Sequence, residues 1–167
     1  MEAGSLEWAP MDWAGWATFG FVATVLLTTI MVASQLGGLS RMDIPMLLGS
    51  IFVKGPDRAR VLGFFIHLVN GQVFALLYAS AFHLIGRAEW WIGALFGLVH
   101  GLVALTVILP LLPGVHPRMA SERSGPTLHK VLEPPGILGL NYGRETPAFT
   151  LLAHVVYGAV LGGFLRP

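Results

Sequence analysis

Residues 61–86 read VLGFFIHLVNGQVFALLYASAFHLIG, a run of 26 residues without Asp, Glu, Lys or Arg. A helix needs about 20 mostly apolar residues to cross roughly 30 Å of hydrocarbon. Three more uncharged runs are long enough, and they cover residues 13–40, 90–117 and 146–165. The next longest runs, residues 44–53 and 134–143, have ten residues each and are too short to span.

These four runs predict an all-α integral membrane protein. The composition agrees, because 54% of the residues are hydrophobic and only 11% are charged, against about 25% charged in soluble domains. We expect a single four-helix transmembrane domain over residues 1–167. Its predicted spans cover about residues 14–33, 61–84, 91–112 and 148–165. Because only Arg87 to Glu89 separate the second and third spans, we expect those two helices to be antiparallel neighbours.

Charge and cysteine content exclude several classes of protein. The net charge of +1 is too small for a nucleic-acid binder that neutralises phosphates. The absence of cysteine excludes disulfides and thiolate metal sites. Glu2, Glu7 and Asp12 precede the first span without any Lys or Arg, which is the reverse of a signal peptide's basic start. We therefore expect the first span to be retained.

The basic residues predict the orientation in the membrane. Eight lie in the two long loops, after the first and third spans: Arg41, Lys54, Arg58, Arg60, Arg118, Arg123, Lys130 and Arg144. Only Arg87 and Arg166 lie at the opposite ends of the spans. Because Lys and Arg favour cytoplasmic loops, we expect both long loops in the cytoplasm and both termini outside. All five tryptophans fall at the predicted outer ends of spans one and three, where indoles favour the headgroup level.

The first long loop contains an apolar segment of its own. Met46 to Phe52 read MLLGSIF and follow Asp43 and Pro45, which are typical of a helix start. Because the run is too short to span, we predict a short interfacial helix on the inner surface of the membrane.

Three histidines are the main chemical feature of the spans, which contain no Asp, Glu, Lys or Arg. They are His67, His100 and His154 in spans two, three and four. Imidazole is a ligand for haem iron and for metals, so the three are candidate cofactor-binding residues. The ligands considered are haem, a (bacterio)chlorophyll and a metal ion of unknown identity. The alternative is that no cofactor binds and the imidazoles are satisfied by neighbours such as Asn70 or Tyr157.

The remaining histidines are His83, His116 and His129, which lie at span ends or in loops. We expect all three to be solvated rather than to act as ligands.

Glycines recur at intervals of four in two spans, the pattern that lets helix backbones approach closely in lipid. They are Gly93, Gly97, Gly101, Gly158 and Gly162. We predict a close-packed helix face that contacts either another helix of this chain or another subunit.

No catalytic residues are predicted. The sequence contains neither a nucleophile and base on one face nor a phosphate-binding glycine loop after a strand, so an enzyme activity is not indicated. Our leading hypothesis is a non-catalytic subunit or scaffold of a larger, energy-converting membrane complex, with membrane lipids and other membrane subunits as partners and no soluble substrate. The alternative is a cofactor-binding membrane protein that uses the intramembrane histidines, and a passive channel is a third hypothesis.

Several short motifs resemble those of a loose family of small four-helix bacterial inner-membrane proteins of unknown function. They are GLSRMDIP (residues 38–45), HLVNG (67–71) followed by FAL (74–76), GLVHG (97–101) and HVVYGAVLG (154–162). The resemblance covers most of the chain and implies a bacterial inner-membrane location. It brings no catalytic residues, and it implies that the His-plus-Gly pattern is a family trait.

Overall fold

The computed structural model describes residues 11–121 and 125–166. Within these residues the fold is all-helical, without a β-strand, and four helices are long and apolar enough to cross a membrane. They are Trp13–Leu36, Pro56–Ile85, Trp90–Val115 and Thr146–Phe164. The predicted all-α class is confirmed, and each of the four predicted spans falls on one of these helices, whereas the bundle topology and the orientation of the termini stay predictions.

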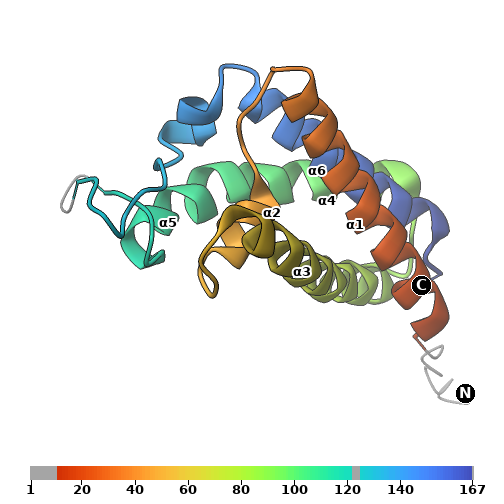
Figure 1. The fold of residues 1–167 in the computed structure, drawn as a ribbon. Coiled ribbons are helices and arrows are strands. Elements are labelled where there is room, and N and C mark those ends of the chain that lie inside the picture. The colour runs from red at the N-terminus through yellow and green to blue at the C-terminus, as the bar shows by residue number, and fades with distance from the viewer. Residues whose placement is uncertain (1–10, 122–124, 167) are drawn as a thin grey trace, which may run out of the picture.

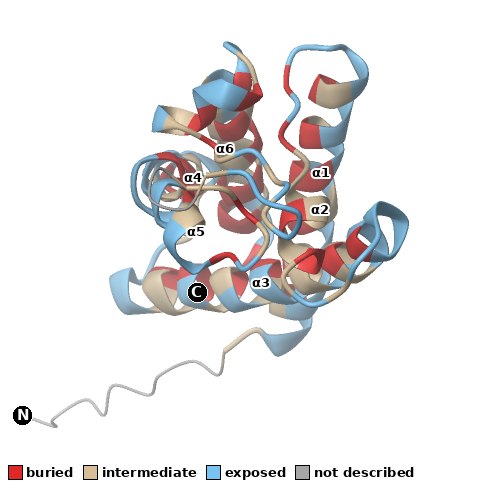
Figure 2. Cartoon of the chain, turned by 60° about the vertical axis from the view of Figure 1, so that its left-hand side comes forward, coloured by how far each residue is buried: buried red, intermediate tan, exposed pale blue. Residues whose placement is uncertain are grey.

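Helix α6 (Thr146–Phe164) forms the centre of the packing, against α1 (Trp13–Leu36) on one side and α4 (Trp90–Val103) on the other. Tyr157 and Leu161 of α6 are almost completely buried. The outward faces of the helices are exposed, and buried residues gather where the spans meet (Figure 2). Exposed apolar side chains on the outward faces are what a helix in contact with lipid requires.

The second and third spans meet through side chains rather than through close backbone contact, although only a short turn joins them. Helix α4 packs chiefly on α6, and its backbone makes few close approaches to α3 (Pro56–Ile85). The two helices meet instead through aromatic rings: Phe82 stacks on Phe96 near the turn, with 5.5 Å between ring centroids, and Phe74 contacts His100 further along. Figure 1 shows how α3 and α4 run from this turn towards the end of the molecule that carries the long loops.

The short helix predicted in the first long loop is present as α2 (Ile44–Gly49). The Asp43 carboxylate accepts a hydrogen bond from the Met46 amide at 2.9 Å and so caps the helix. A methyl group at Gly49 would overlap the Ala59 carbonyl, and one at Gly63 would overlap the Pro45 carbonyl. Helix α2 is therefore packed backbone to backbone against α3, beside which it lies in Figure 1.

The third span contains a π-helical segment that the sequence analysis did not predict. Helix α4 continues into η1 (Ala104–Ile108), and α5 (Leu109–Val115) completes the span. Pro110, directly after this segment, has no N–H to continue the α-helical pattern. A π turn widens the helix by one residue, and such turns are frequent beside functional sites.

The second long loop folds back onto the first. Its 3₁₀ segment η2 (Ile137–Tyr142) leads into α6, and Arg41 of the first loop forms an ion pair with Glu133 at 2.9 Å. The Tyr142 hydroxyl donates to the Glu133 carbonyl at 2.7 Å. Burial and the nearby Glu133 carboxylate raise the pKa of Tyr142 to about 12, so this hydroxyl keeps its proton at neutral pH.

Candidate functional site

The five glycines predicted to pack helices all lie where α4 meets α6: Gly93, Gly97, Gly101, Gly158 and Gly162. A methyl group at Gly93 would overlap the Gly158 carbonyl, and one at Gly158 would overlap the Gly93 carbonyl. Gly97 faces the backbone carbonyl of His154 in the same way. The glycine face therefore has its partner within the chain, and it holds His154 directly against α4.

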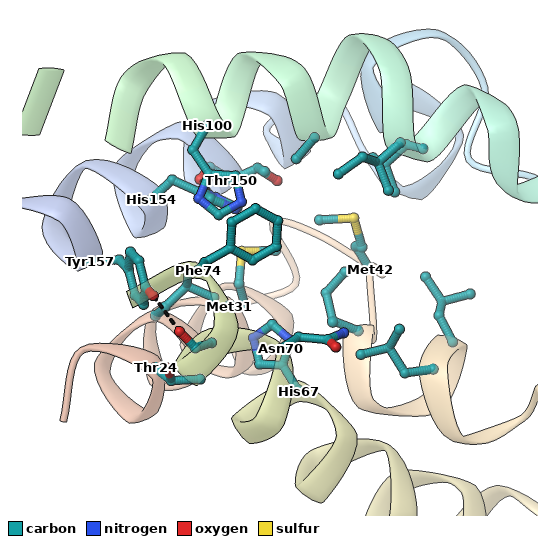
Figure 3. A pocket seen from close by; sticks show the side chains of 18 of the residues that line it. Thr24, Met31, Met42, His67, Asn70, Phe74, His100, Thr150, His154 and Tyr157 are labelled. Carbon is teal, nitrogen blue, oxygen red and sulfur yellow. Dashed lines mark hydrogen bonds between the residues drawn. The ribbon is translucent and has the colours of Figure 1, made fainter. Parts of the chain in front are cut away.

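A cavity of about 160 Å³ lies between the spans, and all three intramembrane histidines line it. His67 comes from α3, His100 from α4 and His154 from α6 (Figure 3). The rest of the wall is mostly apolar, and it comes from α1, α2, η1 and α5 as well as from these three helices. It includes Leu27, Met31, Met42, Ile44, Leu47, Phe74, Ala104, Ile108 and Leu112.

Two of the imidazoles are in contact with each other. The rings of His100 and His154 meet edge to face, with centroids 4.7 Å apart and planes at 78°. The Phe74 ring lies 4.0 Å from that of His100. In Figure 3, His67 and Asn70 approach the cavity from the other side of Phe74. The cavity thus has imidazoles on two sides and an aromatic ring between them.

The hydrogen bond of His154 determines which of its nitrogens carries the proton. Its Nδ1 lies 2.8 Å from the Thr150 carbonyl oxygen, which can only accept a hydrogen bond. Nδ1 is therefore the N–H of this ring. In the neutral imidazole, Nε2 is left with a lone pair and can only accept.

His100 has a neighbouring hydroxyl rather than a carbonyl. Its Nδ1 lies 3.4 Å from the Tyr78 hydroxyl, which can donate or accept. The Tyr78 ring also packs edge to face on Phe96 and on Tyr157. This aromatic cluster closes the cavity towards the turn between α3 and α4.

Two polar side chains of α3, His67 and Asn70, line the cavity. The Nε2 atom of His67 is buried and has no hydrogen bond within the described part of the chain. Asn70 also lines the cavity, but it is exposed rather than buried. At about 1.5 Å per residue, Asn70 lies roughly 14 Å beyond Val61, well inside the span. An unsatisfied buried polar group at this depth costs several kcal/mol, so the Nε2 of His67 points to something else that binds there.

Helix α3 is held in position by contacts of Gly71. The Tyr157 hydroxyl of α6 donates to the Gly71 carbonyl at 2.6 Å. On α1, the side chain of Thr24 occupies the space that a methyl group at Gly71 would need. These contacts join three spans at one point, one helical turn beyond His67.

The cavity restricts which of the expected cofactors could bind. No group of three or more His, Asp or Glu side chains in residues 11–121 and 125–166 is placed to hold a metal ion. Sites for drug-sized ligands measure roughly 300–1,000 Å³, so a haem or chlorophyll macrocycle is too large for a cavity of about 160 Å³. A much smaller molecule fits the space between the histidines.

His116 is buried, not solvated, which corrects the sequence-based expectation. It is only 3% exposed, and its Nε2 lies 2.9 Å from the Leu47 carbonyl of α2. Its Nδ1 accepts a hydrogen bond from the Arg118 amide at 3.1 Å. The Arg118 guanidinium donates to the carbonyls of Ser50 and Val53. His116 and Arg118 therefore attach α2 and the turn that follows it to the third span, whereas His129 is exposed as expected.

Sequence reasoning identified the three histidines but missed two contributors to the site. Thr150 accepts the hydrogen bond of His154 through its backbone carbonyl. In the sequence, only its position four residues before His154 could have indicated this contact. Ala104 and Ile108 of η1 line the cavity, and Pro110 was the available signal for the π turn there.

Comparisons with known proteins do not indicate a function for the chain, so the proposal below rests on the geometry of the cavity. No protein-family model matches the chain, and neither a curated protein nor a solved structure is significantly similar to it.

Proposed function

We propose that this protein binds a small neutral ligand within the membrane, in the histidine-lined cavity. The observation that carries the proposal is the convergence of His67, His100 and His154, from three different spans, on one cavity. The spans contain no charged side chain at this depth, so a neutral ligand is favoured over an ion.

A purely structural role explains some of these side chains but not all. The Nδ1 of His154 is satisfied by Thr150, and His100 has Tyr78 beside it. Among the residues that the structure describes, the buried Nε2 of His67 has no such partner. A ligand that hydrogen-bonds to His67 would remove the cost of leaving its Nε2 unsatisfied in hydrocarbon, and Asn70 lines the same cavity as a second polar contact.

The test is to identify what the cavity holds in the native membrane. The protein is purified gently from its own membranes, and organic extracts are analysed by mass spectrometry, with an absorption spectrum and a metal analysis of the same sample. We expect about one small molecule per chain in the wild type and in the loop variant His129→Ala. His67→Ala and Asn70→Ala should lose it. Extracts that do not differ between wild type and His67→Ala would contradict the proposal.

Membership of a larger membrane complex stays a prediction. The glycines that suggested a partner subunit are occupied by the contact between α4 and α6, so they no longer support that role. The same purification tests it, because a subunit should bring its partner proteins at a constant stoichiometry.

A further inference from the structure

We propose that the ligand is a lipid-soluble quinol, whose dihydroxylated aromatic ring occupies the cavity. This inference rests on the proposed ligand-binding function and adds the chemical class. Its first support is size. An apolar cavity of about 150 Å³ holds one benzene ring, and this cavity measures about 160 Å³. One six-membered ring therefore fits, whereas a macrocycle does not.

The walls suit a flat aromatic ring. Phe74 and His100 lie with ring centroids 4.0 Å apart and planes tilted by 32°, and both line the cavity. Aromatic rings prefer offset-stacked or edge-to-face neighbours at about 4.5–7 Å. A ligand ring beside Phe74 would continue this arrangement.

His154 sets the direction of one hydrogen bond to the ligand. Because its Nδ1 donates to the Thr150 carbonyl at 2.8 Å, its Nε2 can only accept. The ligand group opposite must therefore be a donor, and a ring hydroxyl is a neutral donor. The carbonyl oxygen of the corresponding quinone cannot donate, so His154 distinguishes the two oxidation states of the same ring.

The opposite wall requires a second polar group on the ligand. His67 Nε2 and the carboxamide of Asn70 belong to α3, across the cavity from His154. The amide N–H₂ of Asn70 can donate to an oxygen. A ring with oxygens at opposite ends, as in a 1,4-quinol, would place one near His154 and the other near Asn70 and His67.

The cavity opens where a lipid-borne molecule could arrive. Two of its lining residues, Asn70 of α3 and Ile108 of η1, are also exposed. Ile108 is 41% exposed. Both belong to helices long and apolar enough to span the membrane, so we expect a lipid-soluble molecule to reach the cavity from the hydrocarbon beside them. An apolar tail attached to the ring can therefore remain among the lipid chains.

Retention of a defined probe tests this inference. The full chain in lipid nanodiscs is equilibrated without oxygen with a decyl-substituted 1,4-benzoquinol or with its oxidised quinone, and bound probe is measured by chromatography against protein-free nanodiscs. We expect up to one quinol per chain and about fivefold weaker retention of the quinone, the effect of one hydrogen bond. This comparison uses the wild type, so it does not depend on the folding of a variant.

Two variants then assign the contacts. His154→Leu should lose the preference for quinol while still retaining quinone, and Asn70→Leu should weaken retention of both. His129→Ala is the matched control and should behave as the wild type. Equal retention of quinol and quinone by the wild type, or a preference that survives in His154→Leu, would overturn the quinol assignment.

Failure of this inference is distinguishable from failure of the proposed function. If neither probe is retained but extracts of the native protein contain another molecule that His67→Ala loses, the ligand is not a quinol and the binding function stands. If neither probe is retained and the extracts contain no such molecule, the quinol assignment and the proposed ligand-binding function are both wrong.

Discussion

Gly101 of α4 lies directly against His154 of α6: a methyl group at Gly101 would come within 3.1 Å of the His154 Cβ. The neighbouring Gly97 faces the backbone carbonyl of the same histidine. The edge-to-face contact of His154 with His100 follows from this close approach, because a larger residue at either glycine would separate the two helices. Helix packing and the geometry of the cavity therefore depend on the same residues.

Gly97→Ala should destabilise the protein. The added methyl group would overlap the His154 carbonyl, and a backbone atom cannot move aside without separating α4 from α6. Overpacking of this kind costs about 1–3 kcal/mol. We expect a lower melting temperature in detergent and weaker ligand retention. The control is Gly163→Ala, whose methyl group would lie 3.6 Å from the Trp90 Cβ, an ordinary contact. An unchanged melting temperature for Gly97→Ala would contradict the close contact.

His116→Ala should destabilise the attachment of α2. The variant leaves the Leu47 carbonyl and the Arg118 amide without the imidazole that both contact. A buried polar group without its partner costs about 1–3 kcal/mol. Thermal unfolding followed by circular dichroism measures the loss. His129→Ala removes an exposed loop imidazole and should change little. If both variants unfold at the same temperature, His116 does not hold α2 in place.

Gly63→Ala should displace α2 and expose the cavity wall that α2 forms. The new methyl group would overlap the Pro45 carbonyl. Because the native chain contains no cysteine, a single introduced cysteine is the only thiol that can react with a maleimide. Leu47→Cys, at a position only 7% exposed in the wild type, should react faster with a maleimide when Gly63→Ala is added. Gly114→Ala should not change the rate, because a methyl group there meets nothing within 4 Å.

The orientation in the membrane can be measured with the same cysteine-free background. Arg87 lies in the turn between α3 and α4, and Pro126 lies in the second long loop. If the basic loops are cytoplasmic, Arg87→Cys should react with a membrane-impermeant maleimide in intact spheroplasts. Pro126→Cys should react only after lysis. The reverse pattern would invert the predicted topology.

The cavity residues were only partly predictable. The histidines stood out because polar residues within a span are rare and costly, and their depths along each span could be counted. The burial of His116 was not accessible in this way, because it depends on α2 folding back against the third span. The partner of His154 was also hidden, since a backbone carbonyl such as that of Thr150 leaves no mark in the sequence.

The hydropathy of the chain was enough to predict the apolar helices, their number and their approximate limits. Hydropathy and helix length are properties of each segment alone. Each segment can therefore be compared with the thickness of the bilayer without knowing its neighbours. The close backbone packing of α4 on α6, and the meeting of His67, His100 and His154 at one cavity, became visible only in the folded chain. Such arrangements depend on where two backbones touch, as Gly93 touches Gly158, and these contacts join residues far apart in the chain. The glycine spacing around Gly93 or Gly158 does not show which helix will pack there. The histidine-lined cavity therefore forms only when the helices have packed.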